Sequence, residues 1–270
     1  MKERLDLILV QKGLVQSRDR AKRLIMAGLV SVDGRVEDKA GQKFDIELEF
    51  TIKEDPCKYV SRGGLKLEKA LEEFEIKLDD AICVDMGAST GGFTDCMLQN
   101  GARKVYAIDV GYGQLDYRLR TDPRVVNIER TNIRYLDCAL IKEPADFISI
   151  DVSFISLKHM FPIASEILDQ RGGIVALVKP QFEAGREQVG KNGIVKDKEV
   201  HAEVLYNVFD YAEDSGFFPY NMTWSPVKGA KGNIEYLMYL KRLNADGSNI
   251  PAKDFTPDDL VYLAHQDLKE

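Results

Sequence analysis

Short apolar runs alternate with amphipathic stretches in the part of the chain that begins at residue 81. The first run, 81–87, predicts a strand, and the stretch 91–101 after it predicts a helix. Apolar strands spaced by amphipathic helices indicate a parallel, doubly wound sheet, which is a Rossmann-like fold of the α/β class. The ligand site of such a sheet is expected at the carboxyl ends of its first strands. The further expected strands are 104–110, 125–129, 145–154 and 172–180.

The N-terminal segment has a different pattern, a basic helix followed by a tight turn. Within residues 17–30, Ser17 suits a helix N-cap and Gly28 suits the left-handed residue that closes a helix. Apolar and polar side chains then alternate around Asp33 and Gly34, which is typical of a β-hairpin turn. A small α+β module is therefore predicted ahead of the sheet.

Three segments follow from these patterns. The N-terminal module is assigned to residues 1–60, the α/β domain to 61–244, and a C-terminal tail to 245–270. Within the tail, the residues TPDD at 256–259 predict a short capped helix. A chain of 270 residues, 44% of them hydrophobic, is long enough to bury one large core and a smaller second one.

Charge is distributed unevenly along this acidic chain. The net charge is −7, yet the first 35 residues hold eight Lys or Arg and four Asp or Glu, an excess of four positive charges. A local basic patch binds a phosphate backbone even within an acidic chain, but a basic helix is often only a solvated face. Charge alone does not separate these two interpretations.

Other features of the composition exclude broad classes. No apolar run approaches the ~20 residues of a membrane span, and the N-terminus lacks the apolar core of a signal peptide. A cytoplasmic protein with no membrane partner is predicted. The four cysteines lack C-x-x-C spacing and the three histidines lie far apart in sequence, so neither disulfides nor a metal site is expected.

The stretch VDMGASTGGFTD, residues 84–95, joins the first expected strand to the first expected helix. It is a poor P-loop, because Phe93 stands where a lysine would neutralise the outer phosphates. It is a poor dinucleotide fingerprint, because Ser89 replaces the glycine that lets the backbone approach a pyrophosphate. A hydrolase nucleophile elbow at Ser89 has weak support, since no oxyanion-loop motif precedes the strand.

A nucleoside cofactor without phosphates, S-adenosylmethionine (SAM), fits this turn best. Asp109 ends the second expected strand, about 20 residues after the glycines, where nucleoside-binding sheets place the acidic residue for the ribose hydroxyls. The alternative is that Asp109 only caps the next helix.

The residues at the strand ends favour oxygen as the methyl acceptor. Amine acceptors are commonly served by a [DN]-P-P-[YF] turn, whereas the fourth strand ends in Asp151 without prolines, and no cysteine lies there to attack a pyrimidine carbon. A lysine removes a hydroxyl proton only if its usual pKa of about 10.4 is lowered, which neighbouring charges or burial achieve. As alternatives, Lys66 and Glu235 could be surface charges, and Asp151 and Lys179 could be an ion pair at a strand edge. The candidates are Lys66, Asp151, Lys179 and Glu235.

Several motifs resemble known families. RLDLILVQKGLVQSRDRAKRLIMAGLVSVDGRV resembles the S4 RNA-binding domain, and residues 85–92 resemble motif I of Rossmann-type methyltransferases. The four candidates resemble the K-D-K-E tetrad of FtsJ-like ribose 2′-O-methyltransferases. Outside the tail after about residue 244, the chain resembles the hemolysin A (TlyA-type) family of rRNA methyltransferases. The motifs that carry this resemblance are VSRGGLKLEKAL, DMGASTGGFTD, DVSFISL, LVKPQFE, VGKNGIVKD and KGNIEYL.

The resemblance implies an enzyme that uses SAM to methylate a cytidine 2′-oxygen in ribosomal RNA or ribosomal subunits. Lys179 would be the base or polarising group. Lys66 would favour the neutral form of Lys179 and would hold the ribose or its phosphate. Asp151 and Glu235 would orient the lysines and the hydroxyl. Among the cofactor residues, Asp109 would bind the ribose, and Asn132 and Phe154 would lie against the adenine. The implied cofactor-binding residues are Asp85, Gly87, Ser89, Gly91, Gly92, Asp109, Asn132 and Phe154.

The resemblance and the basic residues together indicate an RNA interface. The stretch 182–197 is rich in glycine and basic residues and is too long for an ordinary connection, so it is either a substrate loop or plain disorder. The candidate RNA-binding residues are Arg18, Lys22, Arg23, Arg35, Arg62, Arg186 and Lys191, with Lys196 beside them.

Two other hypotheses compete with the methyltransferase. One is a non-catalytic RNA-binding or ribosome-assembly factor, which would not need two lysines and two acids at strand ends. The other is a cytolysin, as the family name suggests, which the absence of a membrane helix disfavours.

Overall fold

The computed structural model describes residues 2–15, 18–26, 28–53, 58–242 and 256–268, and within these ranges the side chains of Asp19, Arg23 and Ala230 are not described. The chain divides into two compact units, Met1–Lys58 and Tyr59–Glu270, and each is described by itself.

The first unit is a small α+β module. A two-stranded antiparallel pair joins β1 to β4, and a three-stranded sheet has the order β3-β2-β5. Its core is formed by apolar residues of both helices, such as Leu5, Ile8 and Ile25, packed under Val30 and Val32. The elements are β1 (Lys2–Arg4), α1 (Leu5–Gln11), α2 (Arg18–Met26), β2 (Val30–Val32), β3 (Arg35–Glu37), β4 (Lys43–Asp45) and β5 (Phe50–Ile52).

The predicted helix and hairpin of this unit are confirmed. Gly28 has φ +68° after the end of α2, and the turn between β2 and β3 places Asp33 at φ +47° and Gly34 at φ +76°. Positive φ at both central residues is the geometry that Asp-Gly favours in two-residue hairpins. The predicted N-cap, Ser17, lies outside the described residues.

A buried carboxylate joins the start of α1 to α2. Asp6 is fully buried, and its two oxygens accept hydrogen bonds from Arg4 Nε (2.9 Å), Arg4 Nη2 (3.0 Å) and Arg18 Nη2 (3.1 Å). The two guanidinium groups hold the pKa of Asp6 near 2. One candidate RNA-binding residue, Arg18, is thereby fixed in direction while half of its side chain stays exposed.

The change Asp6→Asn should loosen this module, because two guanidinium groups lose their charged acceptor. We expect a loss of about 1–2 kcal/mol, reduced by the exposure of both arginines. Amide hydrogen exchange of α1 and α2 in the full chain should rise roughly 5- to 30-fold at neutral pH. Unchanged exchange in both helices, with Asp38→Asn as the exposed control, would contradict this role.

The second unit is built on a seven-stranded sheet with the order β11-β12-β10-β9-β6-β7-β8. Strands β8, β7, β6, β9 and β10 are parallel, and β12 is antiparallel to both β10 and β11. The parallel, doubly wound sheet predicted from the sequence is thus confirmed. The strands are β6 (Ile82–Met86), β7 (Lys104–Ile108), β8 (Val125–Ile128), β9 (Ala145–Ile150), β10 (Leu168–Val178), β11 (Phe217–Trp224) and β12 (Tyr236–Arg242).

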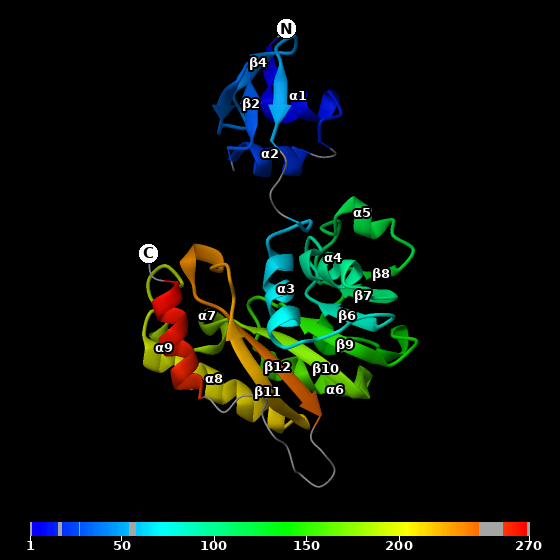
Figure 1. Cartoon of the computed structure of the whole chain (residues 1–270), viewed down its shortest axis with the longest axis vertical. Helices are drawn as coiled ribbons and strands as arrows, with labels where there is room; N and C mark the ends of the chain where they lie inside the picture. The colour runs from blue at the N-terminus through cyan, green and yellow to red at the C-terminus, as the bar shows by residue number, and fades with distance from the viewer. Residues whose placement is uncertain (1, 16–17, 27, 54–57, 243–255, 269–270) are drawn as a thin grey trace. The chain divides into compact units, whose positions relative to one another are not determined.

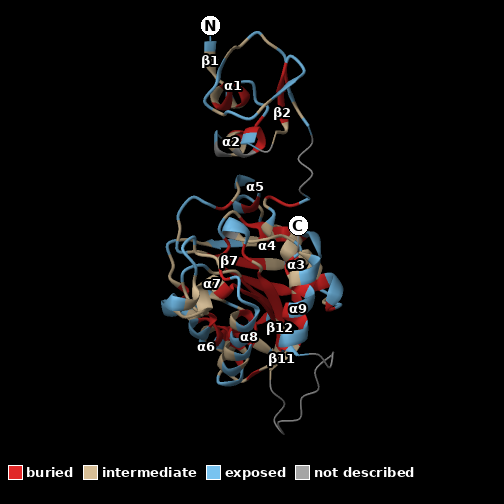
Figure 2. Cartoon of the chain, turned by 90° about the vertical axis from the view of Figure 1, so that its left-hand side faces the viewer, coloured by how far each residue is buried: buried red, intermediate tan, exposed pale blue. Residues whose placement is uncertain are grey.

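Helices cover both faces of this sheet (Figure 1). Alternate residues of β6 show why, since Cys83 packs with α3 and α4, whereas Val84 packs with the cluster that includes α6 and α8. Figure 2 shows the strands as the main buried region of this unit. The helices are α3 (Gly63–Glu73), α4 (Gly92–Gln99), α5 (Tyr117–Arg120), α6 (Phe161–Ile167), α7 (Pro180–Glu183), α8 (Lys198–Glu213) and α9 (Pro257–Asp267).

The capped helix predicted near the C-terminus is confirmed as α9, which lies beside α8 (Figure 1). Thr256 and Asp259 form its capping box, and the buried side chains of Leu260, Val261 and Ala264 join the core of the second unit. The helix is therefore longer than its TPDD signal, because burial of an apolar stripe extends it.

The strand order reverses at β6, whose neighbours are β7 on one side and β9 on the other. At such a reversal, successive crossovers leave on opposite faces and open a crevice at the carboxyl ends of the strands. The segments that follow β6, β7, β9 and β10 are therefore the place to look for a site. Among the described helices, none is long and apolar enough to cross a bilayer.

Candidate active site

The turn between β6 and α4 has backbone conformations that glycine supplies. Gly87 has φ +93°, and a side chain there would collide with the backbone carbonyl of Asp151. Gly92 begins α4 against α3, where a side chain would meet Ser61 Oγ. Gly91 and Ser89 also have positive φ, at +94° and +48°. The turn therefore packs tightly against the ends of β9 and α3.

Asp85 supports this turn from inside the sheet. Its carboxylate is fully buried and accepts hydrogen bonds from Thr94 Oγ1 (2.6 Å) and Ser149 Oγ (3.2 Å). Burial, with the charge of Asp151 as a smaller cause, raises the pKa of Asp85 to about 7. The buried carboxyl thus links the start of α4 to β9 across β6.

Asp109 follows β7 directly and faces the same turn. Its oxygens accept hydrogen bonds from the backbone N–H of Ser89 (2.8 Å) and of Gly111 (2.6 Å). A carboxylate has about four acceptor positions, so two such bonds leave capacity for the paired hydroxyls of a ribose. Ser89 Oγ lies 3.4 Å from Gln114 Oε1. A hydrolase would need a histidine beside this hydroxyl, and none is found among its described hydrogen-bond partners.

The two residues expected near the adenine, Asn132 and Phe154, lie on the segments that follow β8 and β9. Asn132 caps the short helix η1 (Ile133–Tyr135), with its side-chain oxygen accepting from Arg134 N at 3.1 Å. Phe154 has φ +63° and is 89% exposed, and its ring lies 4.8 Å from the ring of Phe182. An aromatic ring so exposed is available to a ligand, whereas a core residue would be covered.

Two ammonium–carboxylate pairs lie at the carboxyl ends of the strands. Lys179 Nζ lies 2.5 Å from Asp151 Oδ1 and 3.0 Å from Ser153 Oγ. Lys66 Nζ, on α3, lies 2.5 Å from Glu235 Oε2, which stands just before β12. Glu235 is buried and Lys66 is largely buried, with side-chain exposures of 3% and 12%, so these two are not surface charges. Lys179 is 9% exposed and Asp151 is 23% exposed.

Two residues that the sequence analysis did not single out follow Lys179 in α7. Gln181 Nε2 lies 3.4 Å from Glu235 Oε1, two residues after Lys179. Glu183 accepts hydrogen bonds from Ser156 Oγ (2.6 Å) and Leu157 N (2.8 Å), and burial raises its pKa. Both belong to the motif LVKPQFE, so membership of that motif was their only signal.

The candidate RNA contacts divide between the two units. In the first, Arg18 and Arg35 are exposed and Lys22 is half-buried, while the side chain of Arg23 lies outside the described residues. In the second, Arg62, Arg186 and Lys191 are exposed, and Lys191 and Lys196 line a surface hollow of about 440 Å³ beside the start of α8.

The loop 182–197 is ordered by specific bonds. Asn233, 2% exposed, accepts from Val195 N (3.1 Å) and donates to Gly193 O (2.9 Å). His201 contacts Val195 O through Nε2 (3.0 Å) and Tyr236 OH through Nδ1 (2.7 Å). Of the two interpretations of this stretch, plain disorder is therefore not supported.

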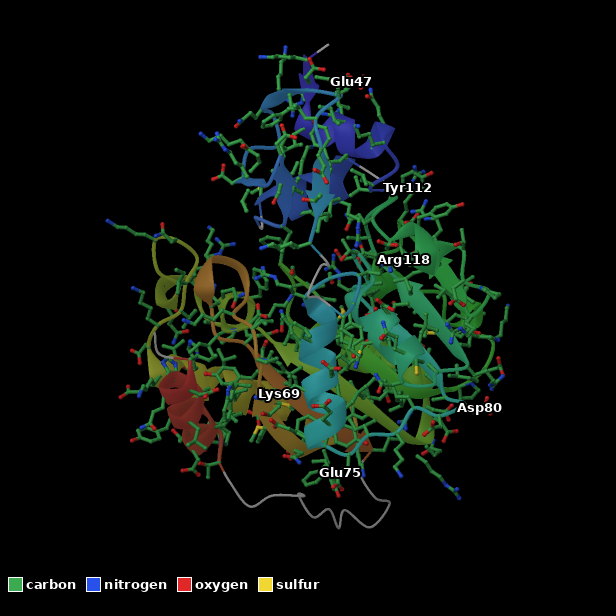
Figure 3. All side chains as sticks on the ribbon, turned by 45° about the horizontal axis from the view of Figure 1, so that its top comes forward. Glu47, Lys69, Glu75, Asp80, Tyr112 and Arg118 are labelled. Atoms are coloured by element: carbon green, nitrogen blue, oxygen red, sulfur yellow. The ribbon has the colours of Figure 1, made fainter. Side chains whose placement is uncertain are left out.

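Exposed tyrosines and arginines gather in the loops after β7 and β8, which the sequence analysis missed. Tyr112 and Tyr135 are 67% and 77% exposed, and the guanidinium carbon of Arg130 lies 4.0 Å from the centre of the Tyr112 ring. Figure 3 shows Tyr112 and Arg118 on one edge of the second unit, and Glu75 and Asp80 on another. Alternation of Tyr and Arg in these loops is the signal that could have found them.

No group of three or more His, Cys, Asp or Glu side chains suited to a metal occurs within the described part of the chain. The side chains of Cys83 and Cys96 are buried, and that of Cys138 is partly buried.

The sheet order with its antiparallel β12, the glycine turn and Asp109 define a methyltransferase of the Rossmann type. The profile of the FtsJ-like methyltransferase family matches residues 59–242, and the profile of the S4 domain matches residues 3–49. The chain belongs to the FtsJ-like methyltransferase family and carries an S4 domain at its N-terminus.

Individual relatives agree with this assignment. A Bacillus subtilis protein assigned as an rRNA methyltransferase, YqxC, is 49% identical over 100% of this chain and 96% of its own. The 16S/23S rRNA (cytidine-2′-O)-methyltransferase TlyA of Mycobacterium tuberculosis is 43% identical over 88% of this chain and 89% of its own. A solved structure assigned as a hemolysin from Streptococcus thermophilus has 47% identity and a TM-score of 0.77, covering 98% of this chain and 96% of that chain.

The change Asp85→Asn should remove a pH dependence of stability. Above about pH 4 the unfolded chain releases the Asp85 proton that the folded protein keeps until about pH 7. The free energy of unfolding of the wild type should therefore fall, relative to the variant, as pH rises from about 4 to about 7, by up to about 4 kcal/mol.

Urea unfolding followed by the fluorescence of Trp224, the single tryptophan, reports on the second unit and measures this difference. The exposed residue Asp214 gives a matched control in Asp214→Asn. A constant difference between Asp85→Asn and the wild type across this pH range would refute the assignment.

Proposed function

We propose that this protein transfers a methyl group from SAM to a ribose 2′-hydroxyl of ribosomal RNA, with a cytidine as the target. The observation that carries the proposal is the presence of two buried or half-buried Lys–carboxylate pairs beside the glycine turn. The relatives named for cytidine 2′-O-methylation and for rRNA supply the substrate class.

The residues around the turn suit SAM. Asp109 keeps acceptor capacity for two ribose hydroxyls, the backbone from Gly87 to Gly91 makes a pocket floor with no lysine for phosphates, and Phe154 exposes an aromatic face. When bound, SAM supplies a methyl group whose bond to sulfur breaks with both electrons left on the sulfur, while the acceptor oxygen forms the new bond.

The Lys–carboxylate pairs would activate the 2′-hydroxyl for methylation. Lys179 polarises the 2′-oxygen, and the hydroxyl proton passes to the Lys179–Asp151 pair as the oxygen is methylated. Glu235 holds Lys66, whose ammonium binds the ribose or its phosphate. Ser153 fixes the direction of Lys179.

Both units would contact the RNA. The S4 domain presents Arg18 and Arg35 to the phosphate backbone, and Arg62, Arg186 and Lys191 add charge in the second unit. The exposed Tyr112 and Tyr135, each with an arginine over its ring, suit stacking of unpaired bases.

Loss of the Asp109 carboxylate should weaken the binding of SAM. Asp109→Ala removes the acceptor for the ribose hydroxyls, and we expect the Kd for SAM to rise at least about tenfold. Isothermal titration calorimetry measures this Kd, with Asp137→Ala, an aspartate that caps the short helix η2 (Cys138–Leu140), as the control. An unchanged Kd would exclude Asp109 from the cofactor site.

Loss of the Lys179 amine should abolish transfer. We expect Lys179→Ala to lower the transfer of tritium from labelled SAM to ribosomal subunits at least about 100-fold, with the Kd for SAM unchanged. The exposed Lys77 gives the control Lys77→Ala, which should retain wild-type transfer. Wild-type transfer by Lys179→Ala would overturn the role of Lys179, and no transfer by the wild type to any ribosomal particle would overturn the proposed function.

A further inference from the structure

Two tight turns from distant parts of the chain meet just before β12. The first turn, 190–194, lies in the loop between α7 and α8, and a backbone hydrogen bond joins the N–H of its first residue to the carbonyl of its last (3.0 Å). The second turn, 229–233, lies between β11 and β12 and is closed in the same way at 2.8 Å. Each turn therefore has a backbone that its own hydrogen bond fixes.

The side-chain amide of Asn233 joins the two turns. Asn233 is 2% exposed, and its Oδ1 accepts from Val195 N (3.1 Å) while its Nδ2 donates to Gly193 O (2.9 Å). An amide both donates and accepts, so this one side chain serves two backbone groups of the first turn and its flank. An apolar side chain at position 233 would leave both backbone groups without this partner.

Three lysines surround the joined turns. Lys191 lies in the first turn, Lys196 follows it, and Lys231 lies in the second turn, and all three are exposed. Lys191 and Lys196 are candidates from the sequence, whereas Lys231 is identified by its position. Its Nζ lies 3.8 Å from where a Cβ on Gly193 would stand, and its backbone has φ +59°. The second turn thus places an ammonium group against the first.

The charge around the first turn suits an anion. Among the described residues, none of these three ammonium groups forms an ion pair. Lys191 and Lys196 line the surface hollow of about 440 Å³, and its acidic lining residue, Asp197, accepts from Glu199 N (2.9 Å) as the cap of α8. A phosphate oxygen accepts hydrogen bonds from ammonium groups, and its charge relieves their mutual repulsion.

The second turn also contacts the Lys66–Glu235 pair. Gly229 packs so closely against Glu235 that a side chain at 229 would collide with Glu235 Oε1. Asn233 itself stands two residues before Glu235. An RNA whose target ribose lies at the Lys–carboxylate pairs therefore brings its neighbouring phosphates to the two turns.

We propose that Lys191 and Lys231 bind phosphate groups of the rRNA backbone beside the target nucleotide, and that Asn233 is the positioning residue that holds their two turns together. The inference rests on the proposed function, because it identifies how the RNA is held at the same site. It adds Lys231 and Asn233 to the residues that act on the substrate.

The salt dependence of RNA binding tests this arrangement. The probe is the ribosomal subunit to which the wild-type protein transfers methyl groups, and its Kd is measured at several salt concentrations with S-adenosylhomocysteine present. The variants are Lys191→Ala, Lys231→Ala, Asn233→Ala and the double variant of Lys191 and Asn233. The exposed residues Lys77 and Asn127 give the matched controls Lys77→Ala and Asn127→Ala. The Kd for SAM reports whether each variant keeps its fold.

Each lysine variant should bind the subunit roughly 3- to 10-fold more weakly, with the slope of log K against log salt reduced by about 1. Asn233→Ala should also reduce this slope by at least about 1, although it removes no charge, with the Kd for SAM unchanged. Adding Lys191→Ala to Asn233→Ala should then change the Kd less than about twofold. The two control variants should match the wild type.

A wild-type slope in Asn233→Ala, or independent effects of Lys191 and Asn233 that multiply in the double variant, would overturn the inference. If Asn233→Ala does not bind SAM, Asn233→Ser carries the same prediction, because its hydroxyl is too short to reach both backbone groups. Wild-type affinity in both lysine variants, together with methyl transfer by the wild type, would overturn the inference alone. Absence of methyl transfer by the wild type to any ribosomal particle would overturn the proposed function and this inference together.

Discussion

Charge that is removed from water has to be paired, and this constraint organises the site. The side chains of Glu235 and Lys179 are 3% and 9% exposed, and an isolated ion at such positions would cost several kcal/mol. Each is matched by an opposite charge at 2.5 Å, Lys66 for Glu235 and Asp151 for Lys179. Removing one partner would leave the other buried and unpaired, so the four residues depend on one another. Hydrophobic residues of the same volume would stabilise the fold as well or better. The presence of charged pairs there therefore agrees with a chemical role.

The fold brings these charges together at one edge. Asp151 follows β9, Lys179 follows β10 and Glu235 precedes the antiparallel β12, so all three come from neighbouring strands. Lys66 comes from α3, which packs on the same face as α4 and reaches the edge through its close contact with the glycine turn. The site is therefore supported by rigid elements, and the short segment from Lys179 to Glu183 ties the loop after β9 to the start of β12.

Much of this arrangement could be predicted from local patterns. The strands, the Asp33–Gly34 hairpin and the position of Asp109 follow from signals that act within a few residues, such as apolar periodicity and the backbone freedom of glycine. The pairing of Lys66 with Glu235, 169 residues apart, could not, because it depends on how α3 packs against the sheet. The orientation of Gln181 and the burial of α9 in the core are likewise properties of tertiary packing that no short pattern records.

The central claim is that the paired lysines act on a ribose oxygen, and the position of the transferred methyl group tests it most directly. Ribosomal RNA incubated with the protein and SAM can be digested to nucleosides and separated by liquid chromatography with mass spectrometry. The account predicts that the new methyl group stays with the ribose fragment of cytidine, as 2′-O-methylcytidine. A methyl group found on the base fragment would contradict it, because the Lys–carboxylate pairs would then have no hydroxyl to activate.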